Sequence, residues 1–206
     1  MRDKVLNLFE LLSDIMAANK EYLIDLDSIV GDGDLGLTMS DGFKAAYQAV
    51  RDSNETDLGK LIYQAGKAMS TAVPSTMGTL MASGLMQCGK ELKGKTELSY
   101  DDFVIFFKAF EDGVISRGKA KVGDKTFLDG WHPGVETLEK ELISGSSMKS
   151  ASLGAYEAAK NGFESTSSII AVHGRAAARG EASKALKDPG AAVAMLMMQA
   201  FSRVWS

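Results

Sequence analysis

The pattern that decides the fold is clearest in residues 58–74, Leu58-Gly-Lys-Leu61-Ile62-Tyr-Gln-Ala65-Gly-Lys-Ala-Met69-Ser-Thr-Ala-Val73-Pro74. Its apolar side chains return every three or four residues, which is the spacing of one face of an amphipathic helix. Pro74 biases Val73 away from the α conformation, so the helix should end just before it. The stretch therefore predicts a helix that packs one side into a core.

The same spacing recurs on both sides of this stretch and predicts seven further helices. Ser99 and Asp102 resemble a capping box, Pro133 is expected to open a helix, and Asp188-Pro189 is a favourable N-cap and first-position pair. No stretch has marked strand character, so the sequence predicts an all-α fold. The apolar positions of the further helices lie within residues 5–16, 43–50, 76–92, 103–114, 135–142, 153–159 and 191–205.

Composition limits the protein class. With 206 residues, 45% hydrophobic content and no evident linker, the chain is expected to form a single domain over residues 1–206. Its net charge of −4 with scattered lysines and arginines argues against nucleic-acid binding. No apolar run reaches the roughly 18 residues of a membrane span, the N-terminus has no signal-peptide pattern, and Cys88 is the only cysteine. A cytoplasmic protein without a membrane anchor is expected.

The most chemically informative stretch is Asp27-Ser-Ile-Val-Gly31-Asp32-Gly33-Asp34-Leu-Gly36-Leu-Thr-Met39. Its glycines permit backbone conformations and close approaches that let the three aspartates converge on one point. Three carboxylates so close repel one another unless a cation binds, and Mg²⁺ is favoured because it takes few protein carboxylates and completes its shell with water and phosphate. The alternative is a solvated glycine-rich turn that caps the next helix.

Three other motifs fit these stretches poorly. Gly31-x-Gly33-x-x-Gly36 has the dinucleotide-binding spacing but follows no predicted strand. An EF-hand loop starting at Asp32 would need ligands where Gly36 and Phe43 stand. The P-loop pattern in residues 118–126 is interrupted by Asp124, where the motif requires glycine followed directly by lysine.

Several helix junctions are candidates for binding an anion. Pro74 to Thr79 precedes a helix N-terminus, where free amides could hold phosphate or where Ser75 and its neighbours could simply cap the helix. The glycine- and lysine-rich segment 118–126 could cover phosphates as a flap or could be an exposed basic loop. Arg175 could fork a phosphate or stack on a base, with an ordinary surface arginine as the alternative.

In chain order, four motifs together resemble the nucleotide-binding L subunit of the bacterial dihydroxyacetone kinases. They are the run from Asp27 to Met39, Gly123-Asp124-Lys125-Thr126-x-Leu128-Asp129, His173-Gly174-Arg175-Ala176 and Asp188-Pro189-Gly190-Ala191. The resemblance implies a barrel of eight antiparallel helices whose loops at one end bind ADP or ATP with two Mg²⁺ ions. It also implies a place in glycerol metabolism. In the version driven by the sugar phosphotransferase system, bound ADP is rephosphorylated by a phosphohistidine M subunit and phosphorylates dihydroxyacetone on a K subunit.

The resemblance also implies roles for individual residues, and none of these is a catalytic side chain. Asp27, Asp32 and Asp34 match the magnesium ligands. Lys125 is expected either to steady the transferring phosphoryl group or to pair with Asp124 or Asp129. The positions implied to bind nucleotide are Leu35, Gly36, Leu37 and Thr38 at the phosphates, Thr76 and Met77 at a helix start, Gly118 and Phe127 at the adenosine, and Arg175, Asp188, Pro189 and Gly190.

The sequence departs from the family pattern at two places. Leu35 stands where the family often has histidine, and Pro74-Ser75-Thr76-Met77-Gly78 replaces a glycine- and serine-rich run. Met77 has no hydroxyl to donate, although Ser75 or Thr76 could compensate. Alternatives are therefore a subunit that exchanges free ATP and serves a different triose or tetrose, and a nucleotide-binding regulatory protein. A homodimer or a hetero-complex is expected.

Overall fold

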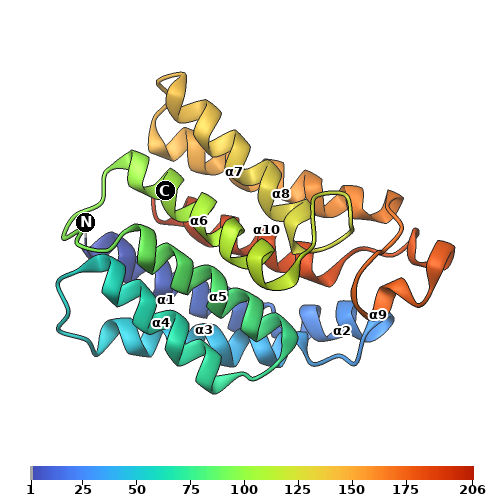
Figure 1. The fold of residues 1–206 in the computed structure, drawn as a ribbon. Helices are drawn as coiled ribbons and strands as arrows, with labels where there is room; N and C mark the ends of the chain where they lie inside the picture. The colour runs from blue at the N-terminus through green and yellow to red at the C-terminus, as the bar shows by residue number, and fades with distance from the viewer. Residues whose placement is uncertain (1) are drawn as a thin grey trace. The chain divides into compact units, whose positions relative to one another are not determined.

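The computed structural model describes residues 2–206, and every regular element in that part of the chain is helical (Figure 1). The all-α prediction is confirmed. Within residues 2–206 the α-helices are α1 (Arg2–Ala18), α2 (Lys20–Val30), α3 (Leu35–Arg51), α4 (Leu58–Ala72), α5 (Thr76–Glu91), α6 (Tyr100–Gly118), α7 (Phe127–Ile143), α8 (Met148–Ser165), α9 (Gly174–Ala177) and α10 (Pro189–Arg203). Two short 3₁₀ turns, η1 (Thr166–Ser168) and η2 (Gly180–Ser183), flank α9.

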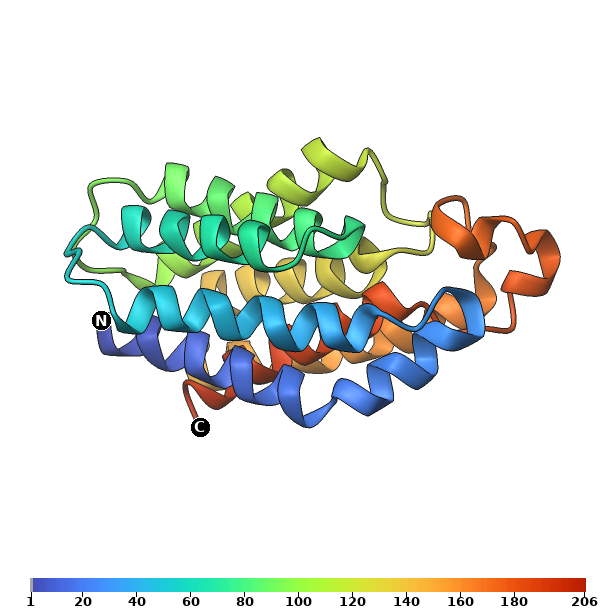
Figure 2. The same ribbon diagram turned by 90° about the horizontal axis from the view of Figure 1, so that it is seen from below.

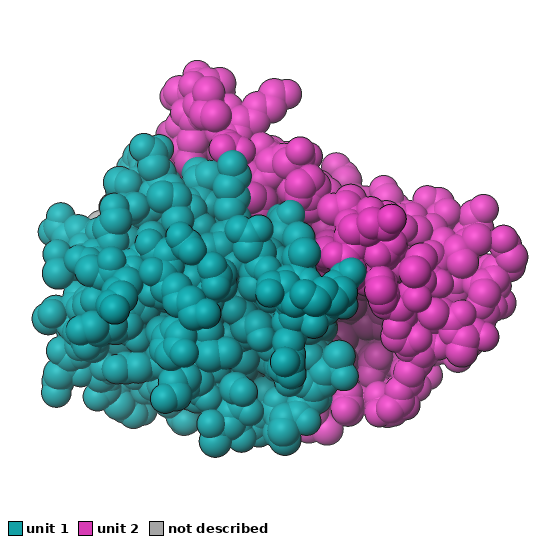
Figure 3. Space-filling view, in the orientation of Figure 1, with its two compact units in different colours: residues 1–17, 38–119 teal, residues 18–37, 120–206 magenta. Residues whose placement is uncertain are grey.

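The contacts divide the chain into two compact units, which Figure 3 shows in different colours. Unit 1 contains the described residues up to Ala17 together with Thr38–Lys119, and unit 2 contains Ala18–Leu37 and Ala120–Ser206. The single domain over residues 1–206 and the closed barrel remain predictions. Within the described residues, no helix is both long enough and apolar enough to cross a bilayer.

Unit 1 is built around α4, α5 and α6, which pack against one another in sequence order. The face predicted from the periodicity of residues 58–74 is the buried one, because Leu58, Leu61, Ile62, Ala65 and Met69 are all inaccessible to solvent. Helix α6 adds Phe103 and Phe110 to the same core. The capping box of Ser99 and Asp102 begins α6 as predicted.

Unit 2 is built around α7, α8 and α10, with α2 against α10. Its core contains the fully buried Trp131 and Phe201, and Phe127 stacks on Trp131 with ring centroids 5.1 Å apart. Met197 and Met198 of α10 are buried and add to this core. Asp188 caps α10 and Pro189 follows as its first residue, also as predicted.

One predicted helix start is wrong, and one helix was not predicted. Pro133 lies inside α7 and does not open it, because Thr126 and Asp129 form a capping box that starts the helix at Phe127. The helix that was not predicted is α2, whose last turn contains Asp27. The pattern of α2 is weak because only Leu23 and Val30 are buried along its length.

The α6 capping box supports a prediction about stability. Asp102 accepts hydrogen bonds from the Ser99 amide at 2.8 Å and the Ser99 hydroxyl at 2.9 Å, and it pairs with Lys95 at 2.9 Å. Burial alone would raise the pKa of Asp102, but these partners outweigh it and lower that pKa. Asp102→Ala should therefore lower the free energy of unfolding by about 1–2 kcal/mol at pH 7.

Urea unfolding over a range of pH checks this prediction. Because the pKa is lowered in the folded state, the stabilisation is present above the unfolded pKa of about 4 and is lost as the pH falls through the folded value. The difference between wild type and Asp102→Ala should therefore narrow below about pH 4. The exposed neighbour Asp101 is the control: an equal loss in Asp101→Ala would contradict a specific role for the box.

Candidate functional site

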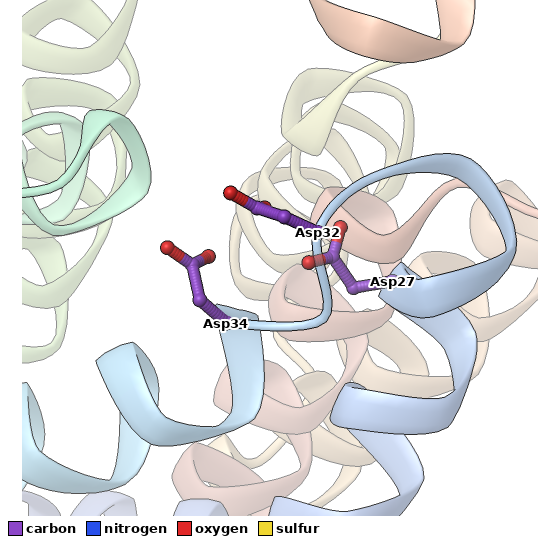
Figure 4. A group of neighbouring side chains, drawn as sticks. All are labelled: Asp27, Asp32 and Asp34. Carbon is purple, nitrogen blue, oxygen red and sulfur yellow. The ribbon is translucent and has the colours of Figure 1, made fainter.

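The three aspartates of the 27–39 stretch converge at the junction of α2 and α3, within unit 2 (Figure 4). Asp27 projects from the last turn of α2, while Asp32 and Asp34 lie on the short connection to α3. One carboxylate oxygen from each lies within 4.8 Å of the others. Asp27 is half-buried, and Asp32 and Asp34 are exposed.

Local backbone geometry produces this convergence. The Gly33 amide donates to Asp27 Oδ2 at 2.9 Å, and Gly33 has a φ of 75°, a conformation that glycine adopts without strain. At Gly36 the start of α3 approaches α2 so closely that a Cβ would lie 2.1 Å from the Lys20 carbonyl oxygen. The glycines at these positions therefore allow the turn that the sequence pattern predicted.

The electrostatics of the cluster favour a cation. Burial raises the pKa of Asp27, and the negative charges of Asp32 and Asp34 raise it further, while hydrogen bonds from the Leu35 and Gly33 amides partly offset both effects. A divalent cation among the three carboxylates would reverse this repulsion. The donors are all hard oxygens and two of the three side chains are open to solvent, which suits a Mg²⁺ ion that retains water.

Arg175 reaches the same cluster from a distant part of the chain. Its guanidinium pairs with Asp32 Oδ2 at 2.5 Å, and both side chains are exposed. Helix α9, which carries Arg175, lies beside the C-terminal end of α2 in both ribbon views (Figures 1 and 2). The resemblance placed Arg175 near a nucleotide, but the ion pair with Asp32 was not predicted.

A second group of predicted residues lies where α7 and α10 begin. Asp188 Oδ2 accepts from the Ala191 amide at 2.7 Å, and the Asp188 amide donates to Thr166 Oγ1 at 2.9 Å. Pro189 is buried, and the Phe127 ring is 3% exposed and packs in the core. A role for Phe127 and Gly190 beside a nucleotide remains a prediction.

Asp188 has a displaced pKa. Burial raises the pKa of its carboxyl to about 7, and the charge of Asp129 raises it too, while the Ala191 and Gly190 amides and the Lys125 ammonium oppose the rise. A carboxyl that titrates near neutral pH at a helix N-terminus is sensitive to any charge placed beside it.

Four of the predicted binding residues belong to unit 1: Thr38, Thr76, Met77 and Gly118. Thr76 is exposed and Met77 is half-buried at the start of α5, and Gly118 is the last residue of α6. Ser75 caps α5 by accepting from the Gly78 amide at 3.0 Å, so the capping role that the sequence allowed for Pro74 to Thr79 is confirmed. Phosphate binding at this helix start remains a prediction.

The predicted ion pair of Lys125 with Asp124 or Asp129 is wrong. Its side chain is 2% exposed and donates to three backbone carbonyls, those of Ile169, Ser183 and Leu186, instead of pairing with Asp124 or Asp129. Asp124 instead pairs with His173, at 3.0 Å. The motif around Lys125 was visible in the sequence. The carbonyl groups that Lys125 contacts, however, lie 44 to 61 residues further along the chain.

Fold and site together define a class: an all-helical protein with a cluster of three carboxylates at a helix junction and an arginine beside it. Residues 29–203 match the DAK2 domain family, and the chain belongs to that family. The predicted resemblance to the L subunits of dihydroxyacetone kinases is thereby confirmed.

Individual relatives agree with this membership. The chain is 33% identical over 198 residues to the ADP-binding subunit DhaL of a PEP-dependent dihydroxyacetone kinase from Escherichia coli, covering 96% of this chain and 94% of that protein. It is 32% identical to an L-erythrulose 1-kinase from Mycolicibacterium smegmatis, and that match covers 95% of this chain but 34% of the relative. These names describe kinases and kinase subunits, in agreement with the prediction of a kinase component.

A solved structure shares the fold. The dihydroxyacetone kinase of C. freundii in complex with AMP-PNP and Mg²⁺ superposes with a TM-score of 0.72 at 20% sequence identity. The match covers 97% of this chain and 33% of that one. At this identity the likeness supports the all-α architecture alone.

The displaced pKa of Asp188 leads to a prediction about pH. Because the folded pKa, about 7, lies above the unfolded value, the folded state holds its proton longer, and stability is lost as the pH rises from about 4 to 7. Asp188→Asn keeps an N-cap acceptor but carries no charge. Relative to this variant, wild type should lose on the order of 2 kcal/mol between pH 5 and pH 8.

Chemical unfolding of both proteins at several pH values makes the measurement. Asp57→Asn, which alters the N-cap of α4 in unit 1, is the matched control because the pKa of Asp57 is lowered and not raised. Burial would raise the pKa of Asp57, but hydrogen bonds from the Lys60 and Gly94 amides outweigh the effect of burial. A wild-type profile parallel to that of Asp188→Asn would refute the pKa assignment.

Proposed function

We propose that this chain is the nucleotide-binding subunit of a dihydroxyacetone kinase. It holds ADP or ATP with Mg²⁺ and passes the phosphoryl group to dihydroxyacetone, or to a related small ketose, bound on a separate K subunit. The observation that carries the proposal is the convergence of Asp27, Asp32 and Asp34 within 4.8 Å. Support comes from the 33% identity, over nearly its whole length, to a relative named as an ADP-binding subunit of this type.

In this proposal Asp27, Asp32 and Asp34 hold the metal, with two Mg²⁺ ions expected. Bound Mg²⁺ would neutralise phosphate charge and favour the charge distribution of phosphoryl transfer. The four residues Leu35 to Thr38 form the first turn of α3, and a helix N-terminus suits a phosphate. Leu35 and Thr38 are buried, so they would contribute backbone groups more than side chains.

Arg175 supplies a positive charge at the cluster. Its guanidinium already forms an ion pair with the carboxylate of Asp32. A guanidinium can donate two hydrogen bonds to the oxygens of a phosphate as readily as to those of a carboxylate. Nucleotide contacts are also proposed, position by position from the family resemblance, for Asp188, Pro189, Gly190 and Phe127, and for Gly118, Thr76 and Met77. Phosphoryl transfer depends mainly on positioning and electrostatics, so no side-chain nucleophile is assigned.

The proposal includes the setting of the reaction. A phosphohistidine M subunit would rephosphorylate the bound ADP in the cytoplasm, as the dependence on PEP in the name of the E. coli relative suggests. The chain would work in a hetero-complex or as a homodimer and serve glycerol metabolism.

A second candidate is a subunit that exchanges free ATP and serves a tetrose. It is favoured by the 32% identity to an L-erythrulose 1-kinase, of which this chain spans about one third. The two candidates differ in how tightly the nucleotide is held.

The first experiment is to denature freshly purified protein and to quantify the released nucleotide and magnesium. Near-stoichiometric ADP supports the PEP-dependent subunit. An empty protein that ATP and Mg²⁺ stabilise by about 4 kcal/mol at a thousandfold excess over Kd supports the exchanging kinase. No bound nucleotide and no stabilisation would overturn the proposed function.

The metal assignment leads to a prediction for two of the aspartates. Asp32→Ala and Asp34→Ala should each abolish Mg²⁺-dependent ADP binding, measured by calorimetry, and leave the helical circular dichroism unchanged. The fold should persist because removing one carboxylate relieves repulsion in the cluster. Asp34→Ala is informative because it leaves the pair of Arg175 and Asp32 in place.

Asp25→Ala is the matched control, since Asp25 is an exposed aspartate of α2 outside the cluster. It should bind ADP like the wild type. Unchanged ADP affinity in Asp32→Ala and Asp34→Ala would exclude the cluster as the metal site.

A further inference from the structure

The segment from Ile169 to Leu186, here called the Arg175 loop, lies beside the buried side chain of Lys125. The loop contains α9 and η2 and extends past the ends of α8 and α10, as Figure 2 shows in orange. Of its residues only Ala171 and Ser183 are buried. Apolar packing therefore contributes little to holding the loop in place, and its position depends on polar contacts.

Lys125, which is itself buried, makes three of these contacts. Its Nζ donates to the carbonyl oxygens of Ser183 and Leu186, each at 2.5 Å, and to that of Ile169 at 3.1 Å. An ammonium group has three donors, and here all three are directed to backbone carbonyls. Because Ile169 is at one end of the loop and Ser183 and Leu186 are at the other, a single side chain ties the two ends together.

The residue before Lys125 holds the loop near its first end. The Asp124 carbonyl accepts from the Val172 amide at 3.1 Å, and the Asp124 carboxylate pairs with His173 at 3.0 Å. Ser183 adds a contact within the loop, since its hydroxyl accepts from the Ala171 amide at 3.0 Å. On the N-terminal side of the loop, the last of these contacts is therefore at His173, two residues before Arg175.

Lys125 occupies a backbone conformation that indicates a constrained position. Its φ is 61°, in the left-handed region that residues with a Cβ adopt only at a cost. Burial lowers the pKa of its ammonium group, while the carboxylate of Asp188 counteracts this effect. Such a residue persists where the surrounding contacts determine it, and here those contacts are the three loop carbonyls.

We propose that Lys125 is a positioning residue: together with Asp124 it anchors the Arg175 loop, so that Arg175 meets Asp32 at the carboxylate cluster. Lys125 does not touch the cluster itself and acts through Arg175. The consequence for nucleotide binding rests on the proposed function, whereas the anchoring of the loop does not.

Two measurements test this on the full chain. The first is amide hydrogen exchange without nucleotide, comparing wild type with Lys125→Met, which keeps the alkyl stem but has no donors. Exchange in residues 169–186 should accelerate about tenfold or more while α8 and α10 keep their protection. Lys121→Met removes an exposed lysine from the same turn and should leave the loop unchanged.

The second measurement is a double-mutant cycle on the Kd for ADP with Mg²⁺. Lys125→Met and Arg175→Ala should each weaken binding on the order of tenfold, because each removes the same charged contact at the cluster. The double variant should be no more than about threefold weaker than Arg175→Ala alone. A general structural role would instead give additive losses, on the order of a hundredfold in the double variant.

The outcomes separate the two ideas. Unchanged exchange in the loop of Lys125→Met, or additive losses in the cycle, would overturn the positioning role. If wild type does not bind ADP with Mg²⁺, the proposed function fails, and the exchange data still decide whether Lys125 anchors the loop. If Lys125→Met does not fold, His173→Ala releases the loop from its exposed side, and unchanged exchange over residues 171–176 would then overturn the anchor.

Discussion

Mutual repulsion among Asp27, Asp32 and Asp34 is the constraint on which the rest of this site depends. Carboxylate oxygens held within 4.8 Å of one another are unfavourable unless positive charge or hydrogen-bond donors compensate. The protein compensates with the amides of Gly33 and Leu35 at Asp27 and with the guanidinium of Arg175 at Asp32. The pKa of Asp27 nevertheless remains raised, mainly by burial and in smaller part by the charges of Asp32 and Asp34. A cluster with residual repulsion is suited to bind a cation.

The contribution of Arg175 extends this requirement to a distant segment. A surface ion pair between two exposed side chains is weak by itself, so it cannot hold an 18-residue segment in place. The segment is held instead by buried donors and acceptors at Lys125 and Asp124, where low exposure makes each hydrogen bond stronger and its loss more costly. The carboxylate cluster at the junction of α2 and α3 is thus linked to the turn before α7 through contacts within unit 2.

Sequence reasoning identified local features reliably, because local rules determine them. The helical spacing of Leu58, Leu61 and Ile62 predicted the buried face of α4, and the caps at Ser99 and Asp188 marked helix starts. It failed where two local signals competed. Pro133 suggested a helix start, but the box of Thr126 and Asp129, which satisfies two backbone donors, begins α7 earlier. Helix α2 was missed because its buried stripe has only two residues.

The sequence by itself determined the all-α class, the family and the three aspartates of the candidate cation site. The aspartates could be identified from the sequence because closely spaced residues joined by glycines can meet without any help from the rest of the chain. Only the tertiary structure decided the partners of Lys125, Asp124 and Arg175. The ammonium of Lys125 finds its acceptors 44 to 61 residues away, and Arg175 finds Asp32 at a separation of 143. Contacts between such distant residues depend on how helices pack, and packing assigned Lys125 to three carbonyls when neighbouring carboxylates were the obvious local partners.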